Sequence, residues 1–123
     1  MTGSKSLVKV CLPLLPRAIV LLTLAGGWDR LTEEFPEDLG AEFDQAFDNV
    51  EHALQQAGGK GLEQVYKLRV YITEPLEDCL EHFARILKGR PAFKNHGPLI
   101  TVVQVKGLFK TSRVEIEAEA YLG

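Results

Sequence analysis

Charged and apolar residues alternate strictly near the end of this chain, from residue 113 to residue 120. A strand has a side-chain period of two, so the apolar residues face one way and Arg113, Glu115, Glu117 and Glu119 the other. Carboxylates in a row repel one another unless water, cations or hydrogen-bond donors meet them. The pattern predicts that solvent, a partner subunit or a ligand covers this face. Glu117 and Glu119 are expected to be solvated, or paired with Arg113 or Lys67.

Cysteine and histidine, which often carry chemistry, are few in this sequence. Cys11 and Cys79 have no metal-ligand spacing with each other or with His52, His82 and His96. We therefore expect no metal site, and nothing in the sequence calls for a cofactor. Two buried, reduced thiols are the default for so few cysteines, which predicts a reducing, cytoplasmic location.

Length and composition predict a single folded domain over residues 1–123. Hydrophobic residues make up 46% of the chain and charged residues 25%, which argues against disorder. The net charge is −3 and the basic residues are scattered, whereas a nucleic-acid surface needs clustered Lys and Arg. No nucleic-acid partner is therefore expected.

An apolar run at residues 18–25 raises the question of a membrane or signal segment. The run is too short to span a membrane. Thr23-Leu24-Ala25 faintly resembles a signal-peptidase site, but Pro13 and Pro16 interrupt the lead-in. A buried strand fits the run better, and no membrane partner is expected.

The elements that position these residues follow from periodicity and turn residues. Strands are expected at residues 7–12, 17–25, 65–73, 99–108 and 113–122. Helices are expected to begin at Pro36 and Pro75, because acids follow each proline and apolar residues recur every three or four positions. This order predicts an α+β domain with two helices on one face of a mixed sheet. The apolar runs 18–25 and 99–105 indicate that another subunit covers the other face.

The whole pattern resembles the Rid family of reactive intermediate deaminases, also called the YjgF type. The resemblance rests on the strand leading to Gly26-Gly27-Trp28-Asp29, on Asn49-Val50, and on the motifs Val103-Xaa-Val105-Xaa-Xaa-Leu108 and Val114-Glu115-Ile116-Glu117-Ala118-Xaa-Ala120. It implies a chorismate-mutase-like α+β fold and a homotrimer with ligand sites at the subunit interfaces. It also implies hydrolysis of enamines or imines to keto acids and ammonia.

The resemblance also implies site residues, and one departs from the family pattern. The family arginine that binds the substrate carboxylate lies eight residues before the leucine of the first motif, and Ile100 stands there. A family position that is commonly cysteine falls on Val102, and the family glutamate is retained as Glu115. The serine and the following glycine of many relatives correspond to Thr23 and Leu24.

The missing arginine changes the expected substrate. An aliphatic side chain cannot replace charged hydrogen bonds worth roughly 1.5–3 kcal/mol each. Leu24, Ile100 and Val102 imply a more apolar cleft, which suits a larger and less charged ligand. The chain is therefore expected to differ from a standard 2-iminopropanoate deaminase, and the sequence does not name its substrate.

Several residues keep two interpretations. Glu115 is either a general acid or base whose pKa is raised by apolar neighbours, or a structural carboxylate that accepts backbone hydrogen bonds across an interface. Trp28 either walls the cleft or plugs the trimer surface. His96 precedes the strand that carries Ile100 and either meets the ligand or is solvated. Arg90 is a candidate for a substitute cation.

These observations favour an enzyme, a divergent Rid-type homotrimer acting on a small reactive organic intermediate. The reaction would be hydrolysis, dehydration, isomerisation or cyclisation, with Glu115 as acid or base. One alternative is the same trimer binding a ligand or partner without catalysis. Another is an enamine or imine deaminase with a substitute cation. Ribonuclease activity, sometimes ascribed to the family, is disfavoured by the acidic charge balance.

Overall fold

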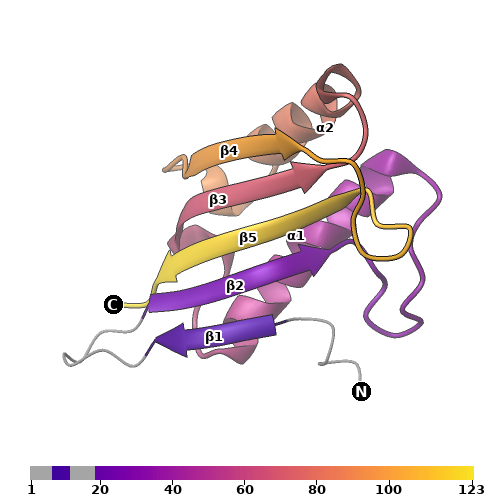
Figure 1. Ribbon diagram of the computed structural model, residues 1–123. Helices are drawn as coiled ribbons and strands as arrows, with labels where there is room; N and C mark the ends of the chain where they lie inside the picture. Colours follow the sequence, from indigo (N-terminus) through magenta and orange to yellow (C-terminus); the bar gives the residue numbers. More distant parts are fainter. Residues whose placement is uncertain (1–6, 12–18) are drawn as a thin grey trace.

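The computed structural model describes residues 7–11, by their backbone, and residues 19–123. Five strands form one sheet in the order β1-β2-β5-β3-β4. They are β1 (Leu7–Cys11), β2 (Ile19–Gly26), β3 (Val65–Ile72), β4 (Leu99–Gln104) and β5 (Val114–Tyr121). Two α-helices, α1 (Leu39–Gln56) and α2 (Leu76–Gly89), cover one face of the sheet (Figure 1). The predicted α+β fold with a mixed sheet and two helices on one face is confirmed.

The connections explain why the sheet is mixed. The neighbouring pairs β1–β2, β2–β5 and β5–β3 are antiparallel, whereas β3 and β4 are parallel. A parallel pair needs a crossover connection, which α2 supplies between β3 and β4. The last strand, β5, enters between β2 and β3 and thus occupies the middle of the sheet (Figure 1). The alternating acidic segment of the sequence is therefore a central strand.

Helix α1 begins later than the proline signal predicts. Asp38 is its N-cap, and a side-chain oxygen of Asp38 accepts a hydrogen bond from the Ala41 amide at 2.9 Å. Pro36 therefore lies outside the helix, in the loop that leads to it. The short 3₁₀ turns η2 (Leu62–Gln64) and η3 (Pro91–Phe93) precede β3 and follow α2.

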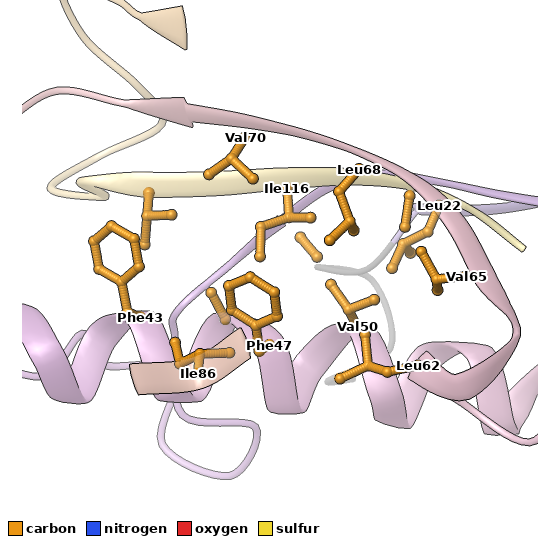
Figure 2. Packing of buried hydrophobic residues seen from close by; sticks show 14 of the residues in the cluster. Leu22, Phe43, Phe47, Val50, Leu62, Val65, Leu68, Val70, Ile86 and Ile116 are labelled. Atoms are coloured by element: carbon orange, nitrogen blue, oxygen red, sulfur yellow. The ribbon is translucent and has the colours of Figure 1, made fainter. Parts of the chain in front are cut away.

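The core lies between the sheet and the two helices. Val70 and Ile116 project from the sheet toward Phe43 and Phe47 of α1 (Figure 2). The ring of Phe43 meets that of Phe83 on α2 edge to face, with centroids 5.1 Å apart. Alternate residues of the strands and the apolar stripe of α1 thus form one apolar layer, as the periods of two and about 3.6 residues predict.

Strand β4 is shorter than the expected run to residue 108. It ends at Gln104, and residues 105–113 form a loop that leads into β5. Two backbone hydrogen bonds fix the beginning and end of this loop: the Val105 amide donates to the Ile72 carbonyl at 2.8 Å, and the Thr73 amide to the Arg113 carbonyl at 3.1 Å. In the part of the chain that the structure describes, no helix is long and apolar enough to cross a membrane.

Candidate functional site

Glu115 lies near the end of the sheet at which β2 and β3 terminate. As the second residue of β5, it is paired with Gly26 on β2 and Tyr71 on β3. It belongs to the strand face that points away from the helices, yet the residue is only 5% exposed. The loop 105–113 folds back toward it, because the Phe109 amide donates a hydrogen bond to Glu115 Oε2 at 3.3 Å.

Burial determines the acidity of this carboxyl group. Desolvation raises the pKa of Glu115, and hydrogen bonds from the Phe109 amide and the Ser112 hydroxyl oppose the shift without cancelling it. The Ser112 hydroxyl also lies 3.0 Å from the Val114 carbonyl, and its single proton serves one acceptor at a time. No cation is among the groups that shift the pKa of Glu115 within the described part of the chain. Such a carboxyl can give and take a proton nearer neutral pH.

The other two carboxylates of β5 have partners of a different kind. Glu117 accepts a hydrogen bond from the Tyr71 hydroxyl at 3.0 Å and faces Arg69 at 3.9 Å. Glu119 accepts from the Tyr66 hydroxyl at 2.9 Å and faces Lys67 at 4.0 Å, which confirms the predicted pairing with Lys67. Each of these carboxylates is matched by a phenol and a cation from β3.

Arg113 does not lie on the carboxylate face, so this part of the strand prediction is wrong. Strand β5 begins at Val114, and Arg113 belongs to the preceding loop. Its side-chain Nε donates to Glu42 Oε1, and its backbone amide to Glu42 Oε2, each at 2.7 Å. Glu42 is fully buried on α1, so this ion pair ties the start of β5 to the helix.

A buried amide fixes the loop beside Glu115. Asn49 on α1 donates through Nδ2 to the carbonyls of Gly26 and Trp28, both at 2.8 Å. Its Oδ1 accepts from Arg30 at 2.9 Å and from Gln45 at 3.0 Å. In the sequence, Asn49 stands out only as part of the family resemblance. A polar residue inside an apolar helix stripe, next to Val50, is the signal that points to such a buried network.

Trp28 and the glycines before it form a close-packed corner. Trp28 is 5% exposed, and its ring meets Phe35 edge to face at 6.4 Å. A side chain at Gly26 would collide with the Trp28 ring, and one at Gly27 with the Glu42 carbonyl oxygen. Trp28 therefore packs within its own protomer and leaves little surface for a ligand.

Ile100 and Val102 lie on the helix side of the sheet. In the parallel register they stand opposite Leu68 and Val70, and both pack against the hydrophobic core. Within one protomer the structure therefore does not bring them together with Glu115, which belongs to the opposite face. Thr23 and Leu24 belong to β2, where the register shifts between Leu22 and Ala25, and their side chains lie outside the described residues.

His96 and Arg90 are also remote from Glu115 in the protomer. His96 Nε2 donates to the carbonyl of Val65, the first residue of β3, at 2.9 Å. Glu115 pairs with Tyr71, six residues further along β3, or about 20 Å at the usual rise per residue. Arg90 Nη1 binds Asp48 on α1 at 2.9 Å, on the helix side.

The residues around Glu115 offer a proton-transfer group but no ligand set for a metal. No cluster of three or more His, Cys, Asp and Glu side chains suited to a metal occurs in residues 19–123 or in 7–11. Cys79 is buried on α2, where burial raises the pKa of its thiol. The side chain of Cys11 lies outside the described residues.

Solved structures share this fold. RidA from an Antarctic Psychrobacter is 26% identical with a TM-score of 0.76, over 95% of this chain and 85% of that one. TdcF of E. coli, with bound serine, is 26% identical with a TM-score of 0.72, over 83% and 79% of the two chains. A YjgF/YER057c/UK114 family member from Mycobacterium tuberculosis is 29% identical with a TM-score of 0.68, over 84% and 78%.

A family assignment follows from the sequence match. No curated protein matches the chain. The sequence model of the family described as endoribonuclease L-PSP matches residues 17–122, which is most of the chain. The resemblance noted from the motifs is thereby confirmed, and the chain belongs to the endoribonuclease L-PSP family, the YjgF or Rid family.

Proposed function

We propose that this protein is a divergent Rid-type enzyme that acts on a small reactive organic intermediate, with Glu115 as the proton-transfer group. One observation carries the proposal: Glu115 is a nearly buried carboxyl whose pKa is raised by burial, at the rim of the sheet face opposite the helices, which no described element covers. General acid and base catalysts work best when their pKa lies near the operating pH. A carboxylate retained only for folding would gain more from a cation beside it.

The substrate site is proposed to lie between subunits of a homotrimer. The uncovered face presents apolar side chains beside the charged residues of β3 and β5. Among them are Leu99, with 72% of its surface exposed, Ile19, Val103 and Tyr121. One hollow of the protomer, of about 240 Å³, lies on the helix side and is lined by Glu51, Arg90 and neighbouring residues; another, of about 60 Å³, lies over β3 and β5 and is lined by Lys67, Glu117 and neighbouring residues. Glu115 lines neither of them. The cleft proposed for Glu115 therefore needs a second chain to complete it.

The protein is expected to be a homotrimer in solution. Light scattering at micromolar concentration should give about three times the chain mass of 13.7 kDa. The reason is the free energy gained by removing the exposed apolar residues of the uncovered face from water. A protein that stays at the mass of one chain would exclude both the trimer and a shared cleft.

The carboxylate substrate 2-iminopropanoate should be turned over poorly. Arg69, Arg90 and Arg113 are engaged with Glu117, Asp48 and Glu42, and no cation acts on Glu115 within the described residues. A carboxylate held without an arginine fork loses charged hydrogen bonds. The imine can be generated in the assay by an amino-acid oxidase acting on alanine, with ammonia release measured.

A comparison reaction keeps this assay informative. Benzaldimine, an imine without a carboxylate, can be formed in the same way from benzylamine by an amine oxidase. We expect faster turnover of benzaldimine than of 2-iminopropanoate. Rapid hydrolysis of 2-iminopropanoate would show instead that a cation from another subunit reaches the substrate, and would favour an ordinary imine deaminase.

A further inference from the structure

Phe109 is an exposed aromatic residue directly beside the proposed proton-transfer group. Its residue surface is 58% exposed, although a phenylalanine gains from burial. Its backbone amide donates to Glu115 Oε2 at 3.3 Å, and the ring is joined to that amide nitrogen through Cα and Cβ of the same residue. An apolar ring thus stands in solvent next to a nearly buried acid.

The backbone around Phe109 is held in place. The Ser112 amide donates to the Phe109 carbonyl at 3.0 Å, and the Ser112 hydroxyl lies 3.0 Å from the Val114 carbonyl. Between them, Lys110 adopts a left-handed conformation with φ 54°, which is uncommon for a residue other than glycine. Backbone strain of this kind persists only where the surroundings enforce it. The loop therefore presents the Phe109 ring from a fixed position.

The charges nearby indicate which ligand this ring could receive. The Lys110 ammonium lies 5.5 Å from the Phe109 ring centroid, an exposed and therefore weak cation–π contact. Lys110 is not among the groups that shift the pKa of Glu115, so it does not act as a counter-charge to the acid. Phe109 thus offers a π face and Glu115 a proton donor and acceptor, while the cation beside the ring, Lys110, contacts the ring rather than Glu115.

We propose that Phe109 is the specificity-determining wall of this site, against which a neutral, planar, conjugated compound such as an aryl imine stacks beside Glu115. The inference rests on the proposed function and names its substrate class. In the hydrolysis, the oxygen of water bonds to the imine carbon, protons pass through Glu115 to the nitrogen, and the C–N bond breaks. An aldehyde or ketone and ammonia result, so atoms and charges balance.

Binding of two unreactive probes tests this inference separately from catalysis. Benzamide is a neutral, planar aryl compound, and benzoate is its anionic counterpart. Titrations followed by NMR or calorimetry should show tighter binding of benzamide. Phe109→Ala should weaken benzamide binding by about tenfold, as expected for the loss of an offset-stacked ring and its contact area. Phe109→Tyr should keep the affinity, and Phe109→Leu should lose most of it.

A matched control comes from the helix side of the molecule. Leu80 on α2 is 54% exposed, close to the exposure of Phe109, and Leu80→Ala should leave benzamide binding unchanged. Equal benzamide affinity in the wild type and in Phe109→Ala would overturn the inference, as would no benzamide binding at all. Tighter binding of benzoate, abolished in Lys110→Gln, would also overturn it and assign the wall to an anionic ligand.

The outcomes also separate the inference from the proposed function. If benzamide binding depends on Phe109 but neither imine is hydrolysed, the wall stands and the proposed chemistry fails. If benzaldimine is hydrolysed and Phe109→Ala leaves its kcat/KM unchanged, the chemistry stands and the wall fails. A tenfold loss in both benzamide binding and kcat/KM for benzaldimine in Phe109→Ala supports the role of Phe109 and the proposed chemistry together.

Discussion

Replacing Glu115 with glutamine is expected to lower turnover of benzaldimine, or of the fastest imine found, by roughly 10²–10⁴-fold. Glutamine keeps the shape of the side chain and an oxygen that can accept from the Phe109 amide, which lies 3.3 Å from the carboxylate. It cannot exchange a proton at neutral pH. The assay is ammonia release under steady-state conditions, with light scattering to verify that the assembly is unchanged.

Glu115→Gln is also expected to be more stable than the wild type, by an amount that depends on pH. Because burial raises the pKa of Glu115 above its ordinary value of 4.5, the folded protein binds this proton more tightly than the unfolded chain does. Its stabilising contribution is fully present below the unfolded pKa and is lost as pH rises through the folded pKa. Glu115→Gln should therefore melt at the same or a higher temperature than the wild type at pH 7, and this advantage should disappear in acid.

Glu117→Gln is the matched control for both measurements. Glu117 lies on the same face of the same strand, but it is partly exposed and meets Tyr71 and Arg69. Its replacement should change turnover and stability little. A structural role for Glu115 would appear instead as a loss of roughly 1–3 kcal/mol of unfolding free energy in Glu115→Gln. Unchanged rate and unchanged stability would exclude both roles.

Arg113→Ala is expected to cost about 3–5 kcal/mol of unfolding free energy, because it leaves a buried charge without its partner. Glu42 has no exposed surface, and Arg113 Nε lies 2.7 Å from Glu42 Oε1. Arg113 Nη2 also donates to the carbonyls of Pro36 at 3.1 Å and Glu37 at 2.9 Å. Among the described groups that donate to Glu42, the backbone amide of residue 113 alone would still meet the carboxylate. Urea denaturation monitored by circular dichroism measures the loss.

Arg69→Ala provides the comparison for Arg113→Ala. The Arg69–Glu117 pair is longer, at 3.9 Å, and both side chains are substantially exposed. Exposed pairs contribute about 0–1 kcal/mol, so this variant should remain close to the wild type. Similar losses in the two variants would contradict the importance assigned to burial of Glu42.

Much of the fold follows from the sequence because it depends on local periodicity. The stripe of Phe43, Phe47 and Val50 predicts helix α1, and the alternation from Val114 to Ala120 predicts strand β5. The family motifs are likewise short stretches of sequence that can be read without the structure. The prediction of a member of the Rid family with an α+β fold is accordingly confirmed by the family match and the structure.

The ends of helices and strands follow less well from the sequence, because capping residues and contacts between distant residues decide them. Pro36 lies before α1 because Asp38 caps the helix instead. Arg113 continues the alternation in sequence but leaves the strand to meet Glu42, a residue 71 positions away. Alternation along the sequence cannot show where β5 begins, because the buried Glu42 on α1 determines where the strand starts.

The sequence by itself determined the helices, the strands, the family and the choice of Glu115 as the candidate acid. Only the tertiary structure separated Glu115 from Glu117 and Glu119, since β3 supplies phenols and cations to the latter two and a loop covers the first. It also placed Ile100 and Val102 on the core face, and Phe109 beside the acid. The physical reason is that burial and neighbouring charge, which set the pKa, depend on strand register and loop closure rather than on spacing along the chain.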